Sequence, residues 1–149
     1  MKRLIFLLVA VLTTALCNAQ VVKESQVPAN VKAVANTKLE GLKVGSWVLD
    51  KNRGYYVGTA TSKDIFKMVT ISLDGKWIET NQALQPGQVP AAIMASLKKN
   101  YLSKGYEGSN YVFVTDTKGK YYMADMSSDD EDLEITLDTN GKILKKEAQ

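Results

Sequence analysis

The sequence predicts an α+β protein made of two tandem units, each a helix followed by about four antiparallel strands, with the helices on one face of the sheet. Three observations predict this fold. Short landmarks recur about 62 to 66 residues apart, a proline precedes an amphipathic stretch in each half, and the rest of each half alternates short apolar runs with glycine-containing turns. Repetition at a fixed period indicates a repeated structural unit, and helices followed by hairpins indicate an α+β layer arrangement.

The repeat is visible in five landmarks that keep their order. The segments that begin at Gln26, Trp47, Tyr55, Ile71 and Gly75 return as the segments that begin at Gln88, Phe113, Tyr121, Ile135 and Gly141. Their spacing changes only where a loop is expected. We therefore place repeat one at about 26–80 and repeat two at about 88–146.

Each repeat is expected to open with a helix that begins at a proline, Pro28 or Pro90, because the fixed φ and missing N–H of proline suit the first helical position. Apolar residues follow at helical spacing. They are Val31, Val34 and Ala35 in the first repeat and Ile93, Met94, Leu97 and Tyr101 in the second. Gly41 and Gly105 end the two helical patterns.

Strands and turns fill the remainder of each repeat. The expected strands are 44–50, 55–61, 65–73 and 76–80 in the first repeat, and 110–115, 120–126, 133–137 and 142–145 in the second. Asp74-Gly75 between two apolar runs is among the strongest hairpin signals. Alternation with polar residues predicts which side chains face the helices: Leu133, Ile135 and Leu137, and, by the repeat, Val69, Ile71 and Leu73.

Residues 1–19 have the layout of a secretory signal peptide. A basic start precedes an uncharged apolar run, 4–15, and small residues lead up to Ala19. The apolar run is shorter than the ~20 residues that a membrane-spanning helix needs. We therefore expect cleavage after Ala19, a mature domain of residues 20–149, and a periplasmic or secreted location without membrane insertion.

Cys17 leaves a second interpretation of the leader open. It is the only cysteine in the chain, and lipid modification at this residue would anchor the protein to a membrane. Leu16 precedes it, where lipoproteins usually carry a small residue. If cleavage instead falls after Ala19, the mature chain contains no cysteine, and its stability must come from a packed core.

The composition argues against catalysis and against nucleic-acid binding. The chain has no histidine, so the usual zinc, haem and nucleophile-base sites lack their residues, and no glycine-rich phosphate loop is present. Without its leader the chain keeps 17 basic and 16 acidic residues, a balance that gives no reason to expect an anionic partner. We expect no enzymatic activity and no cofactor.

The acidic run Asp129 to Asp132, with Glu134 beyond it, raises the question of a calcium site, because clustered carboxylate oxygens suit Ca²⁺. The ligand spacing of an EF-hand is missing. We interpret the run as a solvated loop whose charges discourage pairing between sheet edges.

With these features the chain resembles the PepSY-like family of bacterial exported proteins, which are similar to β-lactamase-inhibitor proteins. The resemblance covers nearly all of the mature chain and rests on the Val-Pro-Ala helix starts, the two Tyr-Tyr pairs and the Asp-Gly-Lys-Trp and Asn-Gly-Lys-Ile turns that end the units. It implies a tandem repeat whose helices leave the other face of the sheet open. In the inhibitor proteins that open face binds an enzyme. No motif that matches their inhibitory residues is found in this sequence.

The outward strand positions are the candidate binding residues, because family members tend to place Glu and Lys there and this chain places apolar residues there in repeat one. The candidates are Tyr55, Val57, Phe66, Met68, Tyr121 and Met123. The predicted function is a non-enzymatic exported binding module, inhibitor-like, whose partner is an exported or envelope protein. The alternative is a structural envelope component that self-associates through the same face, for example as a homodimer.

Overall fold

The computed structural model of the protein describes residues 19–149. Apart from Ala19, the predicted leader lies outside the described residues, and so does Cys17. The elements are β1 (Ala19–Val22), η1 (Glu24–Gln26), α2 (Ala29–Lys38), β2 (Val44–Asp50), β3 (Tyr55–Ser62), β4 (Ile65–Ser72), β5 (Trp77–Ala83), η2 (Pro86–Gln88), α3 (Ala91–Asn100), η3 (Leu102–Lys104), β6 (Glu107–Asp116), β7 (Lys120–Ser127), β8 (Asp132–Asp138) and β9 (Ile143–Ala148). The strands form one nine-stranded sheet in which each strand pairs antiparallel with the next in the chain. The α+β class predicted from the sequence is confirmed.

The two α-helices begin one residue later than predicted. Pro28 and Pro90 are their N-cap residues, each with φ of −56° and an extended ψ. The carbonyl of each proline accepts the first intrahelical hydrogen bond, at 3.1 Å in α2 and 3.0 Å in α3. Proline tolerates this position because its missing N–H is not needed there.

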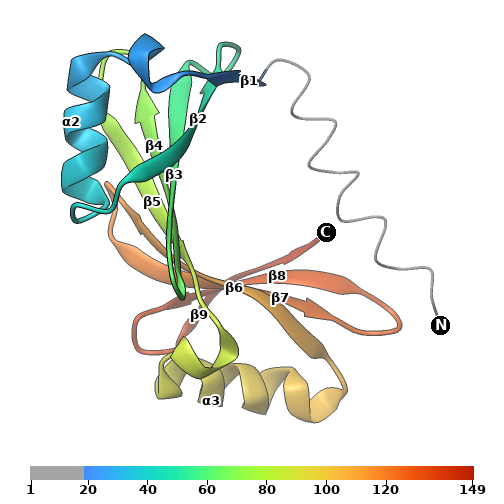
Figure 1. Ribbon diagram of the computed structural model, residues 1–149. Helices are drawn as coiled ribbons and strands as arrows, with labels where there is room; N and C mark the ends of the chain where they lie inside the picture. The colour runs from blue at the N-terminus through green and yellow to red at the C-terminus, as the bar shows by residue number, and fades with distance from the viewer. Residues whose placement is uncertain (1–18) are drawn as a thin grey trace.

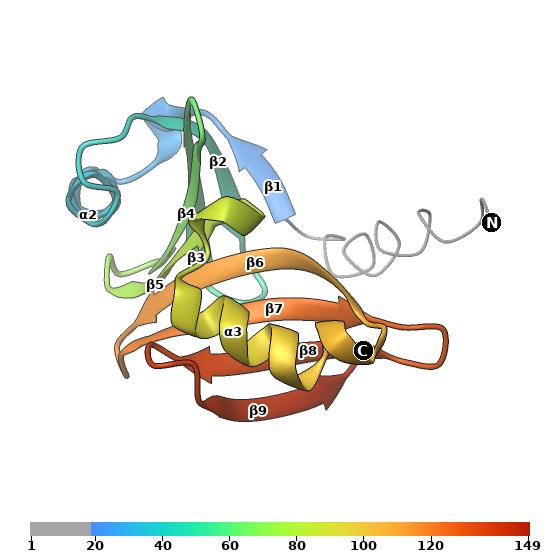
Figure 2. The ribbon, with the colours of Figure 1, turned by 90° about the horizontal axis from the view of Figure 1, so that it is seen from below.

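The sheet bends between β5 and β6, so that β2–β5 and β6–β9 run in different directions (Figure 1). Helix α2 lies along the first part of the sheet and α3 along the second, both on the outer side of the bend. The view from below shows α3 lying across β6, β7 and β8 (Figure 2). The opposite face of the sheet lines the inner angle.

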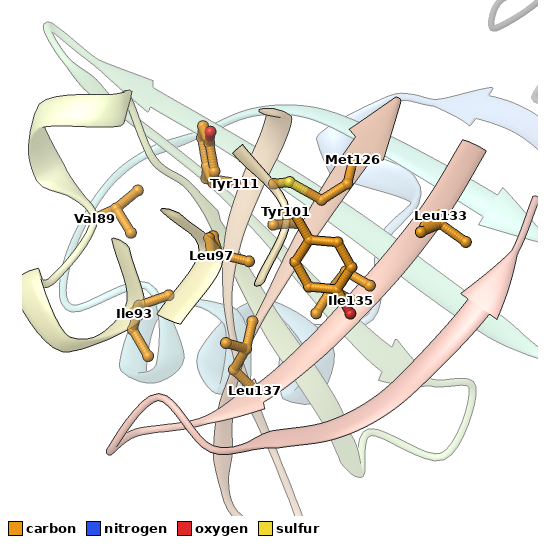
Figure 3. Packing of buried hydrophobic residues seen from close by; sticks show 10 residues of the cluster. Val89, Ile93, Leu97, Tyr101, Tyr111, Met126, Leu133, Ile135 and Leu137 are labelled. Carbon is orange, nitrogen blue, oxygen red and sulfur yellow. The ribbon is translucent and has the colours of Figure 1, made fainter. Parts of the chain in front are cut away.

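Each helix covers a separate hydrophobic core. Under α2 the buried residues are Val27, Val31, Ala35, Leu39, Trp47, Tyr56, Ala60, Val69 and Ile71. Under α3 they are Val89, Ile93, Leu97, Tyr101, Tyr111, Ala124, Met126, Leu133, Ile135 and Leu137, most of which Figure 3 shows packed between the helix and the strands. The residues predicted for the inner faces of the helices are all in or against these two cores.

The strand register predicted from alternation is confirmed, with one exception. Val69, Ile71, Ile135 and Leu137 are fully buried and Leu133 is 1% exposed. The prediction for Leu73 is wrong, because this side chain is 49% exposed. Strand β4 ends at Ser72, so Leu73 lies in the turn to β5 and no longer follows the alternation.

The match of Trp47 with Phe113, which we inferred from the repeated landmarks in the sequence, is also wrong. Tyr56 lies opposite Leu49, whereas Tyr122 lies opposite Phe113. Relative to the second tyrosine of each Tyr-Tyr pair, Phe113 takes the place of Leu49 and not of Trp47, because the β6–β7 hairpin is two residues longer than the β2–β3 hairpin.

Strand β1 was not predicted, and it includes Ala19, which we assigned to the end of the leader. It pairs with β2 from Ala19 opposite Asp50 to Val22 opposite Trp47. Within residues 19–149, none of the helices has the length and apolar character that crossing a bilayer requires.

Candidate partner-binding face

The strand register decides which side chains face away from the helices. Across β4 to β8, one row of mutually facing residues runs Lys67, Gln82, Phe113, Tyr122 and Leu137. This row lies on the face that α3 covers, because Leu137 is buried in the core under α3. Lys67 is two residues from Val69, which is buried under α2, so it lies on that face as well. Both helices therefore cover the same face, and we call the other one the open face.

Two rows of facing residues cross the middle of the open face from β4 to β7, and we call them the junction rows. The first consists of Phe66, Ala83, Val112 and Met123, and the second of Met68, Asn81, Val114 and Tyr121. Facing side chains on neighbouring strands have Cβ atoms about 4.5–5.5 Å apart. The structure thus brings four of the six predicted residues into one continuous patch that bridges the two halves of the sheet.

The other two predicted residues lie on β3, beyond the junction rows. Tyr55 is opposite Ser72, and its hydroxyl accepts a hydrogen bond from Nη1 of Arg53 at 3.1 Å. Val57 is opposite Thr70, in a row that continues through Glu79 to Asp116. Both residues face the open side, but Tyr55 lies at the far end of β3 and is not part of the apolar patch.

Two residues of the junction rows, Val112 and Val114, were not predicted from the sequence. Val114 faces away from both helices and yet is only 2% exposed, so its neighbours on the open face enclose it. The signal in the sequence was the unbroken apolar run 111–114, since a strand without alternation is typical of one covered on both faces. The pairing of β5 with β6, which places this run at the junction, could not be predicted from the sequence.

Asn81 lies in the second junction row, between Met68 and Val114. Its Nδ2 donates a hydrogen bond to Oε1 of Glu79 at 3.0 Å. Its Oδ1 is fully enclosed and, within residues 19–149, accepts no hydrogen bond. A buried acceptor without a donor costs stability, and because this oxygen is enclosed, a partner on the open face cannot donate a hydrogen bond to it.

The two faces of the sheet carry opposite charges. Every acidic residue within the described strands lies on the open face: Asp50, Glu79, Glu107, Asp116, Asp125, Asp132, Glu134, Asp138 and Glu147. Of the four lysines in these strands, Lys67, Lys120 and Lys146 lie on the helix-covered face, and only Lys145 lies on the open face. Helices α2 and α3 each contain two lysines and no acidic residue.

Three carboxylates stand directly beside one another on β7, β8 and β9. Asp125 is opposite Glu134, and Glu134 is opposite Glu147. Burial and the negative charges of Asp125 and Glu147 raise the pKa of Glu134, while Lys145 lowers it. Nζ of Lys145 lies 2.7 Å from a carboxylate oxygen of Glu147. This row of three acidic residues is therefore balanced by one lysine on the open face of the described strands.

Acidic groups also surround Tyr121 in the second junction row. Burial raises the pKa of its hydroxyl, and the negative charges of Asp116, Glu79 and Glu134 raise it further. The negative potential therefore extends from the β7–β9 row to the apolar junction.

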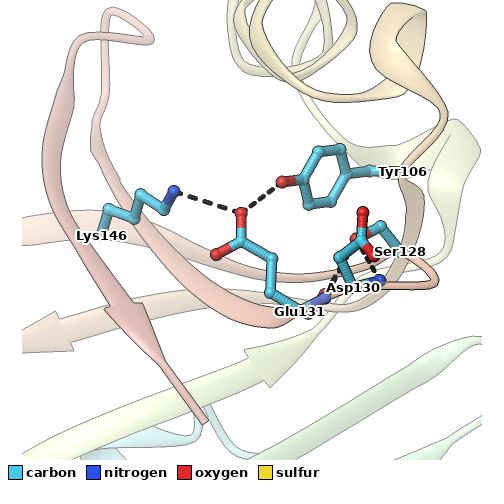
Figure 4. Close-up of polar contacts among 5 residues, drawn as sticks. All are labelled: Tyr106, Ser128, Asp130, Glu131 and Lys146. Carbon is cyan, nitrogen blue, oxygen red and sulfur yellow. Dashed lines mark hydrogen bonds and ion pairs between the residues drawn. The ribbon is translucent and has the colours of Figure 1, made fainter.

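The acidic run after β7 forms a capped turn (Figure 4). The hydroxyl oxygen of Ser128 accepts hydrogen bonds from the backbone N–H groups of Asp130 and Glu131, at 3.3 and 3.2 Å. The carboxylate of Glu131 accepts a hydrogen bond from the Tyr106 hydroxyl and lies 3.4 Å from Nζ of Lys146. Among residues 19–149, no three acidic side chains converge as a metal site requires.

The comparisons with known proteins agree with this architecture. The family model described as "Putative beta-lactamase-inhibitor-like, PepSY-like" matches residues 67–145, just over half of the chain. No curated protein matches the sequence.

Solved structures share the fold at low sequence identity. A BLIP-like protein from Bacteroides fragilis superposes with a TM-score of 0.71 at 11% identity, over 81% of this chain and 85% of that one. A DUF2874 family protein from Bacteroides ovatus gives 0.70 at 18% identity, over 81% and 86%. A structure from Bacteroides eggerthii, described among "putative periplasmic proteins", gives 0.68 at 18% identity, over 81% and 88%. From the family match and this shared fold, we conclude that the chain belongs to the PepSY-like, β-lactamase-inhibitor-like family.

Proposed function

We propose that this protein is a non-enzymatic, exported binding module that holds a protein partner on its open face. The observation that carries the proposal is the pair of junction rows, which gather apolar side chains from both halves of the sheet on a face that neither helix covers. Phe66, at one end of the first row, is 39% exposed. Contiguous apolar patches on an otherwise polar surface mark interaction sites.

The fold supports this proposal. We infer that the two halves are tandem repeats, since each consists of one α-helix followed by four antiparallel strands. The family description and the BLIP-like structure both refer to inhibitor proteins, which act by binding. The absence of histidine from the sequence supports a role without catalysis, because histidine is the commonest general base.

Export is supported by the leader pattern in the sequence and by the description of the structure from Bacteroides eggerthii. We expect protein recovered from the cell envelope or medium to begin at Gln20. Intact-mass analysis measures this directly. A species that begins at an acylated Cys17 would instead assign the protein to the lipid-anchored class.

The binding proposal is tested with a double substitution in the first junction row, Phe66→Ser with Met123→Ser. The matched control is Leu73→Ser with Leu144→Ser, which also replaces two apolar residues, both outside the junction rows and 49% and 56% exposed. Each protein is immobilised and incubated with an envelope extract, and the retained proteins are quantified by mass spectrometry. Circular dichroism checks that every variant is folded.

We expect wild type and control to retain the same partner and the junction variant to lose it, because binding energy concentrates in a few apolar and aromatic residues. Equal retention by all three proteins would contradict the proposal and place binding elsewhere. A mass that rises with concentration in wild type, and does not in the junction variant, would support the alternative of self-association.

A further inference from the structure

The partner's chemistry is indicated by the charge of the open face. All acidic residues of the described strands are on this face, and three of the four strand lysines are on the other one. The formal net charge of the whole chain is +3, so the negative face does not follow from an acidic composition. It results from the side of the sheet on which each charge is placed.

The row of Asp125, Glu134 and Glu147 is costly for the free protein. Like charges directly opposite one another destabilise a sheet pair, and Glu134 has such a neighbour on each side. Amide groups hold Asp125, since Nδ2 of Asn110 and Nε2 of Gln149 donate to it at 2.7 and 3.0 Å. A cation placed over this row would remove the repulsion, so part of the cost would return as binding energy.

The junction rows add two further requirements for an occupant. An apolar side chain of the partner would pack against the apolar residues of these rows, and N–H groups of the partner would donate to the carboxylates beside them. Glu79 and Asp116 face each other on the open face, in the row beside Asn81 and Val114, and their negative charges raise the pKa of the Tyr121 hydroxyl. Lysine and arginine side chains carry donors only, and complementary potentials guide association between proteins.

We propose that the open face binds a cationic protein surface on which lysine or arginine side chains surround an apolar residue. The apolar residue packs on the junction rows, and the cations lie over Asp125, Glu134 and Glu147. This inference rests on the proposed function and adds the chemical class of the partner. A second copy bound face to face would oppose acids to acids, so the occupant is a different protein.

The probe is a short capped peptide in which three lysines flank one phenylalanine, and its counterpart carries three glutamates in their place. Each is titrated into ¹⁵N-labelled protein, and amide chemical shifts report both the affinity and the location of binding. The face variant is Asp125→Asn with Glu134→Gln and Glu147→Gln. The matched control changes the net charge equally at exposed positions away from this row: Glu24→Gln, Asp64→Asn and Asp129→Asn.

We expect the lysine peptide alone to bind, with shifts confined to the open-face residues of β4 to β9 and an affinity that falls as salt is added. The face variant should bind it at least about 10-fold more weakly and the control variant within about 2-fold, since close charge pairs across an interface are strongly coupled and distant exposed charges are screened by salt. The face variant loses like-charge repulsion, so weakened binding cannot be attributed to unfolding; its melting temperature verifies this.

Several results would overturn the inference: equal binding of the glutamate peptide, shifts located on the helices, or equal weakening in both variants. Salt-sensitive oligomers of the protein alone would also overturn it, because they would place the lysine-bearing helices of a second copy on this face. If the face variant still retains the envelope partner and the Phe66→Ser, Met123→Ser variant does not, the binding function stands and only the cationic partner is wrong.

Discussion

Gly141 shows how closely α3 approaches the sheet. The residue lies in the β8–β9 turn with φ of +87°, and a Cβ atom there would be 2.6 Å from the carbonyl oxygen of Ala92. The helix therefore rests directly on the turn, with no room for a side chain between them. Gly75 takes the same place under α2, where a Cβ would meet the side-chain amide of Asn30, a group that can move aside.

Substitution of Gly141 by alanine should therefore cost more than left-handed strain alone. Gly54 is the matched control, since its φ is +73° and a Cβ atom at this position would have nothing within 4 Å. Gly54→Ala should destabilise by about 1–2 kcal/mol, the cost of a left-handed residue with a side chain. Gly141→Ala should exceed that, because backbone must shift. Urea unfolding measures both, and equal losses would show that α3 does not depend on contact with this turn.

At the level of single residues, the sequence was most informative where packing is periodic. Ile71 and Ile135 were predicted to be inward, and both are fully buried. Val114 could not be found in this way, because its burial comes from the pairing of β5 with β6. The six candidate binding residues were predicted to face outward by alternation, but which of them lie together depends on the same pairing.

Among the elements, the strands β7–β9 contain a destabilising contact, because Glu134 lies between the carboxylates of Asp125 and Glu147. Since the pKa of Glu134 is raised above its ordinary value of 4.5, the folded protein binds this proton more readily than the unfolded chain does. Stability therefore falls as the pH rises through the carboxyl range. Three charged groups on the neighbouring strands shift the pKa of Glu134. They are Asp125 on β7, and Glu147 and Lys145 on β9.

Glu134→Gln should stabilise the protein at pH 7, by about 0.2–1 kcal/mol if the loss matches other cross-strand pairs. The gain should shrink as the pH falls through the carboxyl range, where Glu134 becomes neutral in the wild type as well. Thermal melts across this range measure it, with Asp64→Asn as the charge-matched control in the exposed β3–β4 turn. A gain that stays constant with pH would mean that the glutamate is destabilising through its shape and not through its charge.

Most elements were predictable because their signals are local. Both α-helices and eight of the nine strands were expected from periodicity, prolines and glycine turns. Strand β1 was not predicted, because Ala19–Val22 follows directly on the apolar part of the leader and shows no alternation of apolar and polar residues. The ends of β5, β6 and β9 extend beyond the predicted ranges, since pairing with neighbours prolongs strands through polar residues such as Asn81 and Gln82.

At the scale of residues 19–149 together, two separate cores share one continuous sheet. The cores under α2 and α3 have no residue in common, and β5 and β6 connect them through the ladder from Glu79 opposite Asp116 to Ala83 opposite Val112. Enclosed side chains of the junction rows add to this connection, since Val114 is only 2% exposed. The bend at this point, for which no local sequence signal exists, gives the open face its inner angle (Figure 1). We expect the connection to make the two halves unfold together.

Tryptophan fluorescence tests this coupling, because both tryptophans of the protein, Trp47 and Trp77, lie in or against the core under α2. Ile135→Ala removes a fully buried side chain from the other core and should cost ~2–5 kcal/mol. With a urea dependence of ~1–3 kcal/mol per molar, the unfolding midpoint should fall by roughly 1 M or more. In a cooperative protein the tryptophan signal must fall with it, although no tryptophan lies in the altered core.

The same titration is followed by far-UV circular dichroism, and the two midpoints should coincide. Thr136→Ala is the control, since its side chain faces the open side next to Ile135 and its loss should stay within about ±0.5 kcal/mol. A tryptophan transition that keeps the wild-type midpoint in Ile135→Ala, while the circular dichroism curve splits in two, would show that the halves unfold independently. The open face would then span two units held together by β5–β6 pairing alone, and a partner bound across the junction rows would stabilise both units at once.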